Sequence, residues 1–297
     1  MKPPLPEPRL AAPLSPVDPF RHREAYARLL AYLYHAEAAA LEGFRLLTDP
    51  RYVEASDLFD KAARRLIADE AKHLDDVRDM LRRLGVDEVP PPTDAERELW
   101  EGWRRGDLFP LPYKESVASL FCLFSEGLGY AFLHHLHAVT LDPEIKARLA
   151  QNLEDEQMHL RLSISVLERA LARDPDFIPD VAVNLAGYAL LARRPMREIR
   201  GVLDDLGLDY RLIVASSIRF VFELFQIAVD RSGRAAPLWS LADRLTRALA
   251  DHPDATEAIY AALHLPEPPL ARRLVHAWGS RRLAARRAAA LHDRRSA

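Results

Sequence analysis

Two pentapeptides of the chain combine carboxylate and imidazole side chains at a spacing that suits metal binding. They are Asp69-Glu70-Ala71-Lys72-His73 and Asp155-Glu156-Gln157-Met158-His159. In a helix, residues three positions apart leave the same face, so the Glu and the His of each copy can point at one ion. Because the pattern occurs twice, the sequence predicts a metal site with ligands from both copies: Glu70, His73, Glu156 and His159.

Each copy follows a helical stretch that holds one glutamate among apolar residues. In residues 21–47 the apolar side chains recur every three or four positions, and Glu37 takes one position on that apolar face. Glu42 lies more than a quarter turn away, on the solvent side, and is therefore rejected as a ligand. In residues 113–140, Glu126 lies on the apolar face in the same way.

The lengths of the helices place these four glutamates at one level. Long helices are predicted over residues 21–47, from the break at 48–50 to Gly85, over 113–140 and over 143–172, with a short one at 94–104. Glu126 and Glu156 each lie 15 residues from Leu141, at the turn between their helices. Glu37 and Glu70 are centred near Val53, close to the first turn. Two tight helical hairpins would therefore bring all four acids together at mid-height.

Two helices that each donate a Glu, and two that each donate Glu-x-x-His, form the ligand set of the ferritin-like di-iron carboxylate bundle. Residues 21–172 resemble that superfamily, and their spacings are similar to those of rubrerythrin-type and other O2-activating di-iron proteins. The resemblance implies an all-α, ferritin-like four-helix bundle with two Fe ions; a Mn/Fe or Mn2 centre is a variant. The metal ligands would be Glu37, Glu70, His73, Glu126, Glu156 and His159.

Asp69 and Asp155 each precede a ligand glutamate, which rotates them about 100° off the metal-facing side of the helix. An Asp in that position can accept the outer N–H of a ligand histidine and so fix its orientation. His137 follows Glu126 on the apolar face, but at about 16 Å it is too distant to bind the same metals.

The chain also departs from rubrerythrins. Cys122 is the only cysteine, so the rubredoxin-like module is absent and a separate electron donor is expected. The glutamate one turn before the third-helix ligand is also missing, which argues against rubrerythrin-type peroxidase activity.

Outside the predicted bundle the sequence is less informative. Residues 1–20 hold seven prolines and are expected to be an extended leader. Residues 175–297 predict a helical extension or second domain, with about six shorter helices over 180–292. Its last part, 270–297, has eight Arg and one acid and is therefore a basic tail.

Neither a secretory leader nor a convincing membrane span is found, so a cytoplasmic protein without a membrane partner is predicted.

These features favour a non-haem di-iron oxidoreductase that uses O2 or peroxide to oxidise a small organic substrate held beside the metals. One alternative is an iron-binding or ferroxidase protein without an organic substrate. Another is a helical interaction protein that binds an acidic partner through its basic C-terminus. Nucleic-acid binding is disfavoured, since Trp278 is the one aromatic residue near the arginine pairs. The sequence leaves the substrate and the oligomeric state open.

Overall fold

The structure is a computed structural model that describes residues 5–54, 56–105, 113–173, 194–233, 238–252 and 261. Almost all regular structure in these residues is helical, and the predicted all-α class is confirmed. The helices are α1 (Arg23–Leu47), α2 (Asp57–Arg83), α3 (Asp94–Arg105), α4 (Glu115–Val139), α5 (Pro143–Arg173), α7 (Tyr210–Arg231) and α8 (Leu238–Asp251); residues 194–205 are helical as well.

Side chains at the helix ends explain why the boundaries in the first half are close to those predicted. Ser56 caps α2 by accepting a hydrogen bond from the Phe59 amide. Thr93 and Glu96 form a reciprocal capping box at the start of α3. At the end of α2, Gly85 takes a φ of 72°, a left-handed conformation that favours glycine.

A short parallel strand pair was not predicted. β1 (Val53–Glu54) pairs with β2 (Tyr113–Lys114), and the Glu115 carboxylate accepts hydrogen bonds from the Ser56 amide and hydroxyl. These contacts fasten the α1–α2 turn to the start of α4. Strands of two residues are too short to produce an alternating pattern in a sequence.

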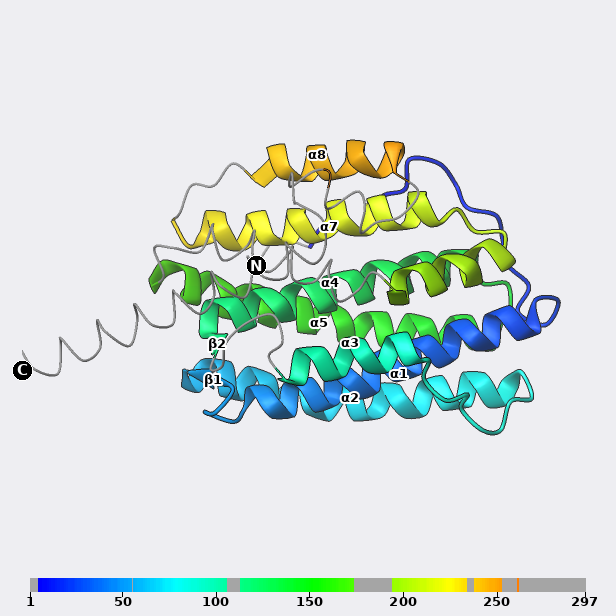
Figure 1. Cartoon of the computed structure of the whole chain (residues 1–297), viewed down its shortest axis with the longest axis horizontal. Coiled ribbons are helices and arrows are strands. Elements are labelled where there is room, and N and C mark those ends of the chain that lie inside the picture. Colours follow the sequence, from blue (N-terminus) through cyan, green and yellow to red (C-terminus); the bar gives the residue numbers. More distant parts are fainter. Residues whose placement is uncertain are drawn as a thin grey trace, which may run out of the picture.

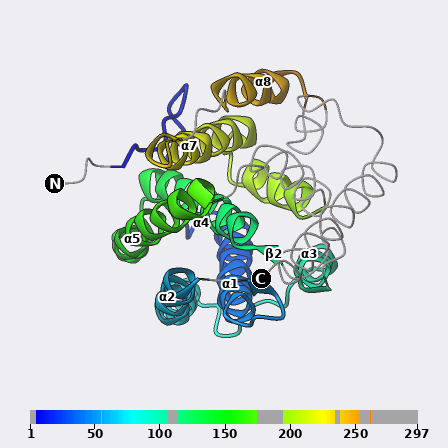
Figure 2. The same cartoon turned by 90° about the vertical axis from the view of Figure 1, so that its left-hand side faces the viewer.

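Four long helices lie side by side and form the body of the molecule (Figure 1). α1 packs along α2, α4 packs along α5, and α2 meets α5. The end-on view of Figure 2 shows α7 packed beyond α4 and α5, with α8 outside it. The two hairpins predicted from the sequence are therefore present and face each other.

The C-terminal helices share the hydrophobic core of the first half. A single cluster of buried residues includes Leu30 of α1, Leu123 of α4, Leu203 of the 194–205 helix and Phe225 of α7. The boundary predicted near residue 175 is thus bridged by apolar packing. The predicted basic tail, at 270–297, lies outside the described residues, as does most of 253–297.

The end of the proline-rich leader is attached to the bundle. The Val17 amide donates to the Val139 carbonyl (2.8 Å), and the Leu141 amide donates to the Val17 carbonyl (3.0 Å). Val17 is buried, and Leu5 and Leu14 also pack against the core. The described part of the leader therefore wraps the surface.

Two helices, α4 and α7, are long and apolar enough to cross a membrane by length and composition. In the structure, 61% of the most apolar window of each is buried within the protein. Packing in the core accounts for much of this apolar composition. The predictions of a cytoplasmic location and of no membrane partner stay predictions.

Gly127 allows α7 to approach α4 beside Glu126. A Cβ atom at position 127 would lie 2.8 Å from Val221 Cγ2 and 3.3 Å from Leu224 Cδ1. Both neighbours belong to α7, so a side chain here would push the two helices apart. At Gly129, on the same helix, an added Cβ would meet nothing within 4 Å.

We expect Gly127→Ala to destabilise the fold by about 1–3 kcal/mol, because the methyl group overpacks the α4–α7 contact. Gly129→Ala is the matched control and should be neutral or stabilising by up to about 1 kcal/mol, since alanine favours helix. Urea unfolding followed by circular dichroism measures both. Equal stability of the two variants would contradict close α4–α7 packing at Gly127.

Candidate metal centre

The structure brings the six candidate ligands together at mid-height between α1, α2, α4 and α5. Five of them are buried: Glu70, His73, Glu126, Glu156 and His159. Glu37 is the most accessible, with 14% of its side chain exposed. The convergence of residues separated by up to 122 positions follows from the two hairpins.

The ligand atoms form two groups of four, in each of which they lie within 4.8 Å of one another. One group contains Glu37, Glu70, His73 and Glu156; the other contains Glu70, Glu126, Glu156 and His159. Glu70 and Glu156 belong to both groups, whereas Glu37 and Glu126 each belong to one. Two groups that share two carboxylates could hold two ions side by side.

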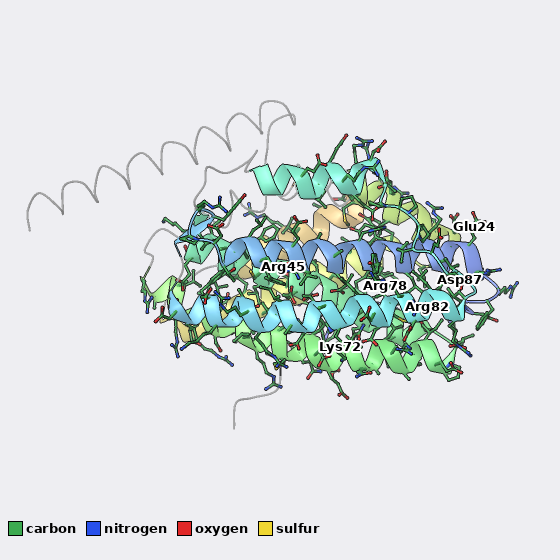
Figure 3. All side chains as sticks on the ribbon, turned by 90° about the horizontal axis from the view of Figure 1, so that it is seen from below. Glu24, Arg45, Lys72, Arg78, Arg82 and Asp87 are labelled. Carbon is green, nitrogen blue, oxygen red and sulfur yellow. The ribbon has the colours of Figure 1, made fainter. Side chains whose placement is uncertain are left out.

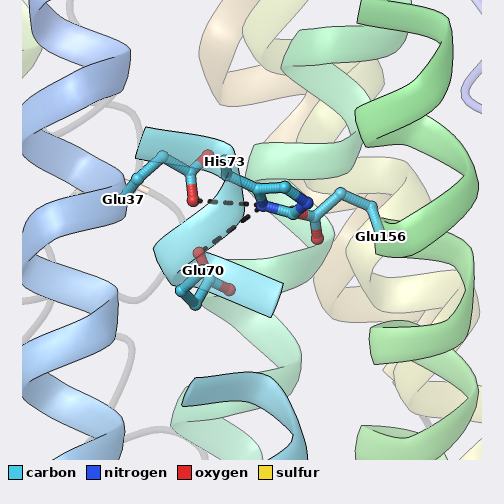
Figure 4. Close-up of side chains that lie close together, drawn as sticks. All are labelled: Glu37, Glu70, His73 and Glu156. Atoms are coloured by element: carbon cyan, nitrogen blue, oxygen red, sulfur yellow. Dashed lines mark ion pairs between the residues drawn. The ribbon is translucent and has the colours of Figure 1, made fainter. Parts of the chain in front are cut away.

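His73 turns its Nδ1 toward the first group (Figure 4). That atom lies 3.6 Å from Glu37 Oε2, 3.7 Å from Glu70 Oε2 and 3.4 Å from Glu156 Oε1. Three carboxylate oxygens therefore surround one imidazole nitrogen.

His159 has the same relation to the second group. Its Nδ1 lies 3.1 Å from Glu126 Oε2, 3.6 Å from Glu70 Oε1 and 3.4 Å from Glu156 Oε2. Glu70 and Glu156 each present one oxygen to His73 and the other to His159. A carboxylate that divides its two oxygens in this way is placed to bridge two ions.

The outer nitrogens of the two histidines face Asp69 and Asp155, and each Asp serves the histidine of the other helix. His159 Nε2 lies 3.3 Å from Asp69 Oδ2, within hydrogen-bond range. His73 Nε2 lies 3.6 Å from Asp155 Oδ2, a longer contact between opposite charges when the imidazole is protonated. The Asp of the α2 pentapeptide thus orients the histidine of α5, and the Asp of the α5 pentapeptide orients the histidine of α2.

Two surface cations, which the sequence reasoning missed, complete these Asp–His pairs. Arg65 Nε lies 3.0 Å from Asp69 Oδ2, and Lys72 Nζ lies 2.6 Å from Asp155 Oδ2. Lys72 is on the outer surface of α2, where Figure 3 labels it. The i,i+4 spacing of Arg65 and Asp69 could have signalled the first pair, but the second joins different helices.

Burial and mutual repulsion raise the pKa values of two of the acids, Glu70 and Glu126, in the metal-free protein. Burial first, and then the neighbouring Glu37 charge, raises the pKa of Glu70 well above its ordinary value. Burial and the Glu156 charge raise the pKa of Glu126 to about 8. Burial also opposes ionisation of Glu37, but its interactions with Glu70 and with the His73 imidazole outweigh burial and lower its pKa.

The pKa values of the two histidines are raised as well, but by neighbouring carboxylates and against the effect of burial. Burial alone would lower the pKa of His73, but the Glu37 and Glu156 carboxylates together outweigh burial and raise the pKa to about 9. In the same way, Glu126 and Glu156 raise the pKa of His159 to about 11. At neutral pH both imidazoles are therefore in the cationic form, with a proton on each ring nitrogen, in the metal-free protein.

The donor set fits two divalent cations. Both ring nitrogens of His73 and one oxygen of Glu70 are buried without a hydrogen-bond partner. Such atoms are costly to bury unless something compensates them. Four carboxylates would balance the charge of two divalent ions, and mixed oxygen and nitrogen donors suit iron or manganese.

The structure also places the residues that the sequence analysis set aside. Glu42 is exposed on α1, outside both ligand groups. His137 lies near the end of α4 and joins neither group. Cys122 is buried one turn before Glu126, where burial raises the pKa of its thiol.

Comparison with protein-family models, with curated proteins and with solved structures finds no match for this chain. The geometry of the site therefore carries the argument on function by itself.

Metal ions and protons compete for the same atoms, so we expect metal affinity to rise with pH. Between pH 6 and pH 8, binding must displace protons from His73 and His159, whose pKa values lie above that range. Each displaced proton adds up to about tenfold in affinity per pH unit. Mn²⁺ titrations at pH 6, 7 and 8, with proton release followed by an indicator dye, measure this effect. Affinity independent of pH would contradict the assignment of both imidazoles as ligands.

Proposed function

We propose that the chain is a non-haem di-iron oxidoreductase with a ferritin-like bundle, which uses O2 or peroxide to oxidise an organic substrate beside the metals. The observation that supports it best is the pair of four-residue ligand groups that share Glu70 and Glu156. A single structural ion would need one such group, whereas two groups with shared carboxylates suit a pair of redox metals.

In this proposal the protein supplies ligands, orientation and exclusion of water. Glu37 and Glu126 would each hold one ion, Glu70 and Glu156 would be shared between both ions, and His73 and His159 would bind through Nδ1. Asp69 and Asp155 orient the imidazoles from behind. When bound, the two iron ions supply the redox chemistry that amino-acid side chains lack. A Mn/Fe or Mn2 centre would use the same ligands.

Electrons would come from a separate donor, since Cys122 alone cannot hold an iron–sulfur or rubredoxin-type centre. The alternative of an iron-binding or ferroxidase protein uses the same ligands but needs no space for an organic molecule. The apolar cavity described below favours the oxidoreductase. The alternative of an acidic partner on the basic tail falls outside the described residues.

Removal of a shared ligand should reduce iron binding more than removal of an unshared ligand. With Fe(II) added under anaerobic conditions, wild-type protein is expected to bind two irons per chain. Glu70→Ala and Glu156→Ala disrupt both groups and should lose both irons, whereas Glu37→Ala and Glu126→Ala should each lose one. Glu42→Ala, on the exposed side of α1, is the control and should keep both.

Iron content after desalting measures these changes, and a visible-region spectrum after exposure to air reports on oxidation of the centre. Two irons retained in Glu70→Ala would show that the ligand assignment is wrong. A ferroxidase would oxidise iron and accumulate mineral without substrate.

Removal of the orienting carboxylates should weaken one ion each. Asp69→Asn acts on His159 and so on the group with Glu126, while Asp155→Asn acts on the group with Glu37. Each change should reduce affinity for that ion by about 10–100-fold. Asp75→Asn, an exposed position on α2, is the control. Stepwise Mn²⁺ titration separates the two ions, and unchanged affinity in both Asp variants would contradict an orienting role.

A further inference from the structure

A cavity of about 250 Å³ adjoins the candidate metal centre. Its wall includes all four candidate glutamate ligands, Glu37, Glu70, Glu126 and Glu156, but neither histidine. Molecules in the cavity would therefore meet the carboxylate side of the centre, while the histidines face Asp69 and Asp155.

The C-terminal helices form part of the wall of this cavity. Met196 and Leu203 of the 194–205 helix, Val221 and Phe222 of α7, and Leu245 of α8 line it opposite α1. The close approach at Gly127 holds α7 against α4 at the level of Glu126. This gives the region after residue 194 a structural role that its sequence did not indicate: it is one wall of a chamber on the metal centre.

The chemistry of the wall selects against charge. Apart from the four glutamates, the described lining residues are mainly aromatic and aliphatic, with polar groups at Tyr32, Ser125 and Ser217. Among them there is no Lys, Arg or His. An anionic group inside the cavity would find no cationic side chain in the described wall to offset its loss of water. A cationic group would meet the four glutamates, but in the proposed centre two divalent ions would already balance their charge.

The dimensions favour an elongated ligand. Along α1 the lining runs from Tyr32 to Leu47, a separation of fifteen residue steps, which at helical rise is about 22 Å. A dry, apolar cavity of about 150 Å³ is sufficient to bind benzene. The present cavity is larger and extended, so it suits a chain or a substituted ring rather than a small gas alone.

We propose that this cavity binds an uncharged, elongated apolar molecule as the substrate, and that the helices from residue 194 to α8 form its binding wall. That the bound molecule is a substrate rests on the proposed function. That the cavity binds an apolar molecule does not depend on metal. Gly129 offers a way to test it, because it lines the cavity one turn from Glu126 and a Cβ there meets nothing within 4 Å.

The experiment is isothermal titration calorimetry of the full chain with 1-decanol, with and without saturating Mn²⁺. Wild-type protein should bind decanol, and decanoate should bind at least tenfold more weakly. Gly129→Leu fills the cavity and should weaken decanol binding at least tenfold while Mn²⁺ binding is retained. Gly201→Leu is the matched control, since it is helical, exposed and free of neighbours within 4 Å, and it should bind as wild type does.

Ala40→Leu, on the α1 side of the cavity, provides a second filling variant if Gly129→Leu does not fold. Decanol binding that both filling variants leave unchanged would overturn the proposal, as would wild-type protein that binds Mn²⁺ but no decanol. Decanoate binding as tight as decanol binding would overturn the uncharged class. Decanol binding that is lost in Gly129→Leu, in a protein that binds no metal, would support the cavity and overturn the proposed function.

Discussion

The burial of four carboxylates and two imidazoles in one layer of the bundle is the constraint on which the rest of the structure depends. Ionised groups without partners are very costly in an apolar interior. In the metal-free protein burial and the neighbouring carboxylates raise the pKa of Glu70 and so favour its neutral form, while both histidines have raised pKa values that favour the cationic form. The bundle folds around a polar layer that is balanced either by protons or by metal, and hydrophobic packing above and below that layer must offset its cost.

The arrangement of the core reflects this layer. The smaller apolar cluster contains Phe44 and Leu66, on one side of the site along α1 and α2, and the larger one contains Leu33 and Val77 on the other side. The larger cluster continues into α7 and α8. The polar layer contributes little to hydrophobic stabilisation. The C-terminal helices enlarge the apolar core and line the side of the site next to α1 and α4.

The sequence predicted the helices of the first half and the residues that converge, because both depend on helical periodicity and on distance from a turn. Glu37 and Glu126 were identified by their phase on an apolar face, and the structure brings them to Glu70 and Glu156. The sequence did not reveal the Lys72–Asp155 pair, the two short strands or the cavity. Each depends on which helices become neighbours, and no local spacing encodes that choice. For the same reason the sequence did not indicate that α7 lines the cavity.

The surroundings of the site divide into two chemically different sides. On the α2 and α5 side, His73 and His159 lead through Asp155 and Asp69 to the surface cations Lys72 and Arg65. On the α1 and α4 side, the glutamates border an apolar chamber. In the proposed oxidoreductase, charge would be stabilised on the first side and an apolar substrate held on the second. In that proposal the separation would keep the charged Asp–His pairs away from the substrate. Part of it has a simple helical cause: in each pentapeptide Asp and Glu are adjacent in sequence and therefore point about 100° apart.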